Sequence, residues 1–162
     1  MPRPEAIDVP VPGLMCFGCS ASNQYGLQLN FFKRGHQVFT EFTPSEFLQG
    51  WFGAVHGGVL STLIDELANF TVAGLLRRIG VTRDLQVHFR RPLYVNEPIT
   101  MVGVLGEQKK SLVTVKCELS SARGDLCCEG EATVFLLERQ QFERMIPGGQ
   151  IPVALTPFFP LG

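Results

Sequence analysis

The sequence predicts an α+β fold in which a curved antiparallel β-sheet wraps one long central helix. A single long apolar segment, from about 57 to 78, has the length of a helix and is apolar on nearly every face. Two strand-like segments precede it and four follow, and most of these alternate apolar and polar residues. A helix that is apolar nearly all round must be covered by its surroundings, and a strongly curved sheet can do this.

The two strands before the helix are expected to form a hairpin. The segments LQLNFF (27–32) and QVFTEFT (37–43) flank KRGH (33–36), a short connection that contains a glycine. The helix follows from Gly57. We expect Arg77 and Arg78 to occupy its last turn and Gly80 to lie just beyond its end, since cations and glycine are favoured there.

Four strands are expected after the helix, within 85–94, 98–107, 112–120 and 126–138. An apolar face opposite a polar face is typical of an antiparallel sheet that is covered on one side. The order β-β-α-β-β-β-β with a single long helix is that of the hotdog fold. The expected inward positions are Leu85, Val87 and Phe89, then Val113, Val115, Cys117 and Leu119, and finally Cys128, Gly130, Ala132 and Val134.

Composition limits the classes of partner. The chain has 162 residues, of which 45 % are hydrophobic, and this describes one globular domain with a real core. A net charge of −1 lacks the cationic excess that phosphate backbones require, so we expect no nucleic-acid partner. The apolar run 57–76 contains Asp65, Glu66 and Asn69, which argues against a membrane span, so we expect no membrane partner.

The two ends of the chain are rich in proline. We expect a proline-rich arm over 1–15, a hotdog domain over 16–146 and a Pro/Gly-rich tail over 147–162. The first residues lack the apolar core of a signal peptide, and the cysteine count is odd. These features predict a cytoplasmic protein with free thiols.

The chemistry is expected on one face of the helix. Gly58, Ser61, Thr62, Asp65 and Asn69 fall on one stripe of small or polar side chains. The His-Gly-Gly start exposes backbone N–H groups, and such donors can hold a developing oxyanion, with about 2.7–4 kcal/mol per donor. A carboxylate beside them could activate water against an acyl group. The structural alternative is that the Asp65 carboxylate has no catalytic role and accepts hydrogen bonds from Asn69 or from a neighbouring backbone group at an interface.

Two stretches carry a family resemblance. GWFGAVHGGVLSTLIDE (50–66), followed by VTRDLQVHFRRPL (81–93), resembles the hotdog acyl-CoA thioesterases of the PaaI-like branch. Their pattern is Gly-x-x-His-Gly-Gly with an acidic residue nine positions after the histidine, and Gly53, His56, Gly57, Gly58 and Asp65 match it. The upstream CFGCSASNQYGLQLNFF (16–32) resembles the opening of many members, so the resemblance covers about 16–138.

The resemblance implies hydrolysis of acyl-CoA thioesters without a cofactor. It implies that Asp65 is the base or nucleophile, that the Gly57 N–H polarises the carbonyl, and that His56 shapes the turn and helps to hold the thioester. Substrate contacts are expected from four further residues, with an arginine for the phosphates of CoA: Gly58, Asn69, Thr82 and Arg91.

The spacing along the helix predicts an oligomer. Gly57 and Asp65 are eight residues apart, or ~12 Å along a helix, too far to serve one carbonyl. Two antiparallel helices related by a two-fold axis bring Asp65 of one chain to Gly57 of the other. We therefore expect a homodimer, or a dimer of dimers, with shared sites.

Other functions would require other residues or another arrangement of these residues. A hotdog enoyl-thioester hydratase would need a histidine five residues after Asp65, where this chain has Phe70. A non-catalytic acyl-CoA-binding protein stays open. Ser61, His56 and Asp65 share one helix and cannot meet as a catalytic triad. Glu66 is the second candidate base, expected instead to pair with a strand residue or a neighbouring subunit.

The cysteines could suggest a metal. Cys16 and Cys19 have the spacing of half a zinc site, but no second ligand pair follows, because Cys127 and Cys128 are adjacent and point to opposite faces of a strand. The Cys-x-x-Cys also precedes a strand, unlike a thioredoxin-type motif. The sequence therefore predicts no metal.

Overall fold

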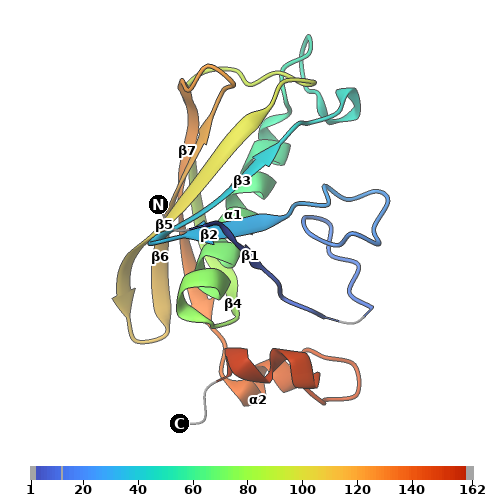
Figure 1. Cartoon of the computed structure of the whole chain (residues 1–162), viewed down its shortest axis with the longest axis vertical. Helices are drawn as coiled ribbons and strands as arrows, with labels where there is room; N and C mark the ends of the chain where they lie inside the picture. Colours follow the sequence, from blue (N-terminus) through green and yellow to red (C-terminus); the bar gives the residue numbers. More distant parts are fainter. Residues whose placement is uncertain (1–2, 12, 160–162) are drawn as a thin grey trace.

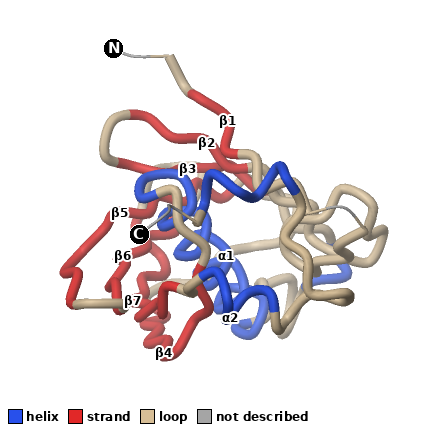
Figure 2. Tube along the Cα trace, turned by 90° about the horizontal axis from the view of Figure 1, so that it is seen from below, coloured by secondary structure: helices blue, strands red, loops and turns tan. Residues whose placement is uncertain are grey.

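The computed structural model describes residues 3–11 and 13–159 as a seven-stranded antiparallel sheet with one long helix against it. The strand order is β1-β2-β3-β5-β6-β7-β4. The strands form an arc with α1 on its concave side, which confirms the hotdog fold (Figures 1 and 2). The elements are β1 (Glu5–Ile7), β2 (Phe31–Arg34), β3 (Gln37–Phe42), α1 (Gly57–Leu76), β4 (Gly80–Phe89), β5 (Ile99–Lys109), β6 (Leu112–Ser120), β7 (Leu126–Leu136) and α2 (Arg139–Glu143), with 3₁₀ turns at Glu46–Leu48 and Val153–Phe158.

The first hairpin is shorter than predicted because its leading segment is engaged elsewhere. The backbone N–H groups of Leu27 and Leu29 donate to the carbonyls of Phe17 and Gly18, at 2.7 and 2.9 Å. These residues therefore bond to the preceding loop, and β2 begins only at Phe31. The N-terminal arm adds a strand that was not expected, since β1 pairs with β2.

The end of α1 also differs from the prediction. The helix ends at Leu76, and Arg77 is its C-cap in the left-handed conformation, with φ 51°. The expected basic last turn was wrong, because Arg77 and Arg78 lie past the helix. Gly80 is the first residue of β4 rather than a cap.

The inner face of the sheet is predicted well in its central strands. Val113, Val115, Cys117 and Leu119 in β6 are buried, as are the alternating residues of β7. Two glycines let the helix approach closely: a Cβ on Gly103 of β5 would overlap Thr71 Oγ1, and one on Gly130 of β7 would lie 2.8 Å from Ile64. The sheet thus meets α1 at glycine positions on two different strands.

The strand β4 departs from the predicted pattern. Its apolar side chains were expected to face the core, yet Leu85 is 37 % exposed and Phe89 is 56 % exposed. The reason is its position, because β4 is the last strand of the sheet and pairs with β7 alone. The chain therefore presents a ten-residue edge strand with apolar side chains in contact with solvent.

The C-terminal tail packs on the far end of α1 (Figure 1). Leu155, Phe158 and Phe159 are buried against Ala73 and form a second apolar cluster beside the main core. By length and composition α1 is apolar enough to cross a membrane, a test that the core helix of a soluble fold also passes. In this structure α1 is the core helix, packed against strands β1 to β7.

Candidate active site

The start of α1 is held by its own histidine. His56 is the N-cap residue, and its Nδ1 accepts a hydrogen bond of 2.9 Å from the Gly58 N–H. The neutral ring that accepts at Nδ1 carries its proton on Nε2, which leaves a second donor at the helix start. The Gly58 N–H is therefore occupied. Among residues 3–11 and 13–159, no hydrogen-bond acceptor is found for the Gly57 N–H.

The hydroxyls on the stripe are occupied as well. Ser61 Oγ donates to the Gly57 carbonyl and Thr62 Oγ1 to the Gly58 carbonyl, each at 3.0 Å. Both bonds run back along the helix, so neither hydroxyl is oriented by a histidine. This geometry agrees with the rejection of a catalytic triad.

Asp65 lies half-buried at the middle of the stripe with a free carboxylate. Within the described ranges, none of the side-chain hydrogen bonds or ion pairs involves its carboxylate oxygens. Asn69 does not satisfy this carboxylate: its amide donates to the Asp65 backbone carbonyl at 3.0 Å and to Thr82 Oγ1 at 2.8 Å. Of the structural alternative, the part in which Asn69 bonds the Asp65 carboxylate is therefore not seen in the described part of the chain.

The Asn69–Thr82 bond joins the helix to the edge strand. The pairing of β4 with β7 shifts register between Thr82 and Asp84, and such a bulge redirects side chains locally. Thr82 is half-buried while its neighbours Val81 and Arg83 are exposed. The Asn69 Oδ1 atom is buried and has no partner in the described part of the chain, so an acceptor is available beside Asp65.

Glu66 occupies a different environment from Asp65. Cys16 Sγ lies 3.6 Å from Glu66 Oε1, and a Cβ on Gly18 would overlap the Glu66 carboxyl group. Among the described residues, Glu66 therefore contacts the Cys-x-x-Cys loop rather than the strand residue that was one of its expected partners. Burial raises the pKa of the Glu66 carboxyl group. Adjacent carboxylates thus differ: one is free and the other is enclosed by thiols.

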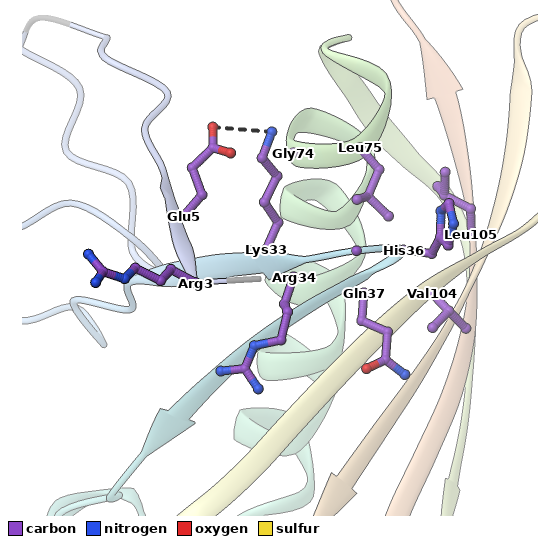
Figure 3. A pocket seen from close by; sticks show the side chains of 11 residues that line it. Arg3, Glu5, Lys33, Arg34, His36, Gln37, Gly74, Leu75, Val104 and Leu105 are labelled. Atoms are coloured by element: carbon purple, nitrogen blue, oxygen red, sulfur yellow. Dashed lines mark ion pairs between the residues drawn. The ribbon is translucent and has the colours of Figure 1, made fainter. Parts of the chain in front are cut away.

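Two cavities are lined by charged side chains. One of about 740 Å³ lies at the C-terminal end of α1, where Figure 3 shows Lys33 paired with Glu5 and Arg3, Arg34 and His36 nearby. Another, of about 520 Å³, is lined by Arg91, which also forms an ion pair of 3.4 Å with Asp125. Neither of these two cavities is lined by Gly57 or Asp65. Arg91 is therefore not brought next to Asp65 within one chain.

Several aromatic side chains lie in the loop before the helix start or close to Gly57. Phe47, Trp51 and Phe52 are 88 %, 80 % and 93 % exposed in the loop that precedes it. Phe89 was not assigned to the site from the sequence, yet a Cβ on Gly57 would lie 3.5 Å from its ring. The signal for Phe89 was the alternating pattern of its strand, which was assigned to the core.

Phe31 of β2 and Phe70 of α1 form an aromatic pair. Their rings stack at 4.3 Å, with Phe31 buried in the core. Phe70 stands at the position where a hydratase would need a histidine. The other histidines are exposed: His36 lies in the turn between β2 and β3, and His88 lies in β4.

A curved antiparallel sheet around one long helix defines the hotdog fold, and here that helix begins with a capped glycine pair and carries Asp65 at its middle. Residues 52–128 match the family model described as "Thioesterase superfamily". The matched segment is just under half of the chain and includes the candidate site, and over it the chain is similar to this superfamily.

Three solved structures illustrate the similarity. A thioesterase superfamily protein is 24 % identical with TM-score 0.64, over 70 % of this chain and 56 % of its own length. A hypothetical thioesterase from Streptococcus pneumoniae TIGR4, solved with coenzyme A, is 21 % identical with TM-score 0.62, over 67 % and 87 %. The E. coli PaaI protein of the phenylacetic acid degradation operon is 14 % identical with TM-score 0.63, over 68 % and 80 %. At these identities the likeness is one of fold. No curated protein matches this chain.

Proposed function

We propose that this protein hydrolyses acyl-CoA thioesters to a free acid and CoA. The observation that carries the proposal is the state of α1: its first residue has an N–H with no partner among the described residues, and its middle bears a free carboxylate. The family match supports thioester chemistry, and the coenzyme A in the S. pneumoniae structure supports CoA as the thiol.

In the proposed reaction the Gly57 N–H donates to the thioester carbonyl oxygen, and the helix dipole favours negative charge there. Asp65 removes a proton from water as the water oxygen attacks the carbonyl carbon. The tetrahedral intermediate then expels CoA as a thiolate, which takes up the proton. Attack by Asp65 itself, through an acyl-enzyme anhydride that water then hydrolyses, uses the same groups.

His56 and the hydrogen-bonded pair of Thr82 and Asn69 position the groups that react. The His56 cap fixes the first turn by accepting from the Gly58 N–H, and the Gly57 N–H has no partner among the described residues. A proton on Nε2 gives His56 a second donor for the thioester. Asn69 and Thr82 hold the middle of α1 against β4, and Asn69 Oδ1 remains available to a substrate or a partner group.

We propose that each site is shared between two chains. Gly57 and Asp65 lie eight residues apart on one helix, or ~12 Å, whereas both must reach the same carbonyl. The exposed apolar edge strand β4 supports an interface, because long edge strands with apolar side chains favour pairing with another chain. Phe89 links that edge to Gly57, so an interface through β4 also borders the helix start.

The packing of Phe70 in the core disfavours the alternative function, an enoyl-thioester hydratase. That reaction needs an acid beside the base, and Phe70 is stacked on Phe31 instead.

The first experiment is a thiol-release screen of the wild-type chain over short, medium, long and aromatic acyl-CoAs. Turnover of at least one class is expected. Tight binding without thiol release across the screen would instead identify a non-catalytic acyl-CoA-binding protein.

A further inference from the structure

A cluster of three metal-ligating side chains lies on the face of α1 next to the candidate site. The Sγ atoms of Cys16 and Cys19 and a carboxylate oxygen of Glu66 all lie within 4.8 Å of one another. All three residues are half-buried. The sequence offered no second ligand pair to join the Cys-x-x-Cys, whereas the fold supplies a third ligand from a helix fifty residues away.

We propose that Cys16, Cys19 and Glu66 bind one zinc ion through two thiolates and one carboxylate oxygen. Zinc prefers tetrahedral sulfur and oxygen ligands, at about 2.3 Å and 2.0 Å. A sulfur and an oxygen on one tetrahedral zinc are then ~3.5 Å apart. The distance between Cys16 Sγ and Glu66 Oε1 is 3.6 Å. A water molecule completes the four-coordinate shell.

The backbone of the loop is arranged to bring these ligands together. Gly18 stands between the two cysteines, and any larger residue there would overlap the Glu66 carboxyl group. The Ser20 N–H donates to the Cys16 carbonyl at 3.2 Å, which folds the Cys-x-x-Cys into a compact turn. The loop is anchored in turn by Leu27 and Leu29, whose N–H groups bond to its carbonyls. The cluster is thus held by main-chain contacts on both sides.

The charges of the cluster favour a cation. Three groups that become anions on deprotonation lie together, and none of the ion pairs between described residues involves Glu66. A divalent cation stabilises all three anions at once. Thiolate ligands select zinc over magnesium or calcium.

The consequence of metal binding is structural. A zinc ion would fasten the loop around residues 16–19 to the middle turn of α1. That turn carries Asp65, so the metal would hold the helix segment that presents the carboxylate. The bound metal takes no part in the proposed hydrolysis, and the two proposals stand or fall separately.

The test measures metal binding by the full-length, reduced protein. Zinc content after dialysis gives the stoichiometry, and Co²⁺ reports the ligands through the visible bands of a tetrahedral site and a sulfur-to-metal charge-transfer band. We expect one metal per wild-type chain and a higher thermal midpoint with zinc than with chelator. The variants are Cys16→Ser/Cys19→Ser and the near-isosteric Glu66→Gln. Cys127→Ser, which removes a buried thiol outside the cluster, is the control.

The double variant should lose the charge-transfer band and bind zinc at least ~10-fold more weakly, as should Glu66→Gln, since even outer-shell changes at zinc sites weaken binding by about 10–100-fold. Cys127→Ser should bind as the wild type does. The proposal is overturned if the reduced protein takes up no zinc, or if folded Glu66→Gln binds zinc as tightly as the wild type does. Isolation of a Cys16–Cys19 disulfide whose reduced form binds no metal would overturn it too.

Discussion

Replacing Asp65 with asparagine separates the chemistry of the carboxylate from its structural role. The substitution keeps the volume, and none of the hydrogen bonds among the described residues uses the Asp65 carboxylate. The Asn69 amide bonds the backbone carbonyl of residue 65, which the substitution retains. We therefore expect the free energy of unfolding to change by less than about 0.5 kcal/mol, as for substitutions that remove no packing or hydrogen bond.

Catalysis should respond differently. Loss of a general base lowers kcat by at least ~10²-fold, equivalent to ~2.7 kcal/mol of barrier. The assay is thiol release from the acyl-CoA that the wild type turns over best, with thermal unfolding followed in parallel. Glu66→Gln is the matched control, because it removes the adjacent carboxylate, and it should cost much less in kcat. The wild type and both variants are compared with excess chelator present, so that loss of the proposed zinc ligand Glu66 does not enter the comparison. Turnover near the wild-type rate by folded Asp65→Asn would refute the assignment, and the reverse ranking would make Glu66 the base.

Two further predictions concern the packing of the helix and the edge strand. Gly103→Ala should destabilise the fold by about 1–3 kcal/mol through overpacking, because the new methyl group overlaps Thr71 Oγ1. Urea unfolding measures the free energy of unfolding, and Thr71→Ala in the same chain should recover part of the lost stability. Phe89→Asp should shift the protein from dimer to monomer in analytical ultracentrifugation and abolish turnover, since the exposed ring lies on the edge strand beside Gly57. Gln86→Asp, on the opposite face of the same strand, is its control. A Phe89→Asp protein that stays dimeric would remove β4 from the proposed interface.

The sequence pattern over a few neighbouring residues was enough to predict the elements that depend on those neighbours alone. The alternation in β6 and β7 gave the correct inner face, because those strands lie inside the sheet. The helix start was also predictable, since a histidine cap followed by glycines is a feature of neighbouring residues. The hotdog order followed from the single long apolar segment.

The remaining features depend on long-range neighbours. The strand β1 forms because the N-terminal arm finds the free edge of β2, and no local pattern in three residues shows this. The apolar side of β4 has the same alternation as a core strand, and its exposure follows from its place at the sheet edge. Glu66 meets Cys16 across fifty residues of chain, so its environment could not be derived from spacing. The role of Phe89 beside Gly57 was missed for the same reason.

The central claim is that each active site takes Gly57 from one chain and Asp65 from its partner. The most direct measurement co-refolds two inactive variants, Asp65→Asn and Gly57→Pro, the second of which removes the N–H. Under shared sites a mixed dimer has one site with both groups intact and one with neither. Random pairing makes half of the dimers mixed, so the mixture should recover about a quarter of the wild-type activity. Mixed dimers that form, as shown by a tag on one variant, yet remain inactive would contradict the account.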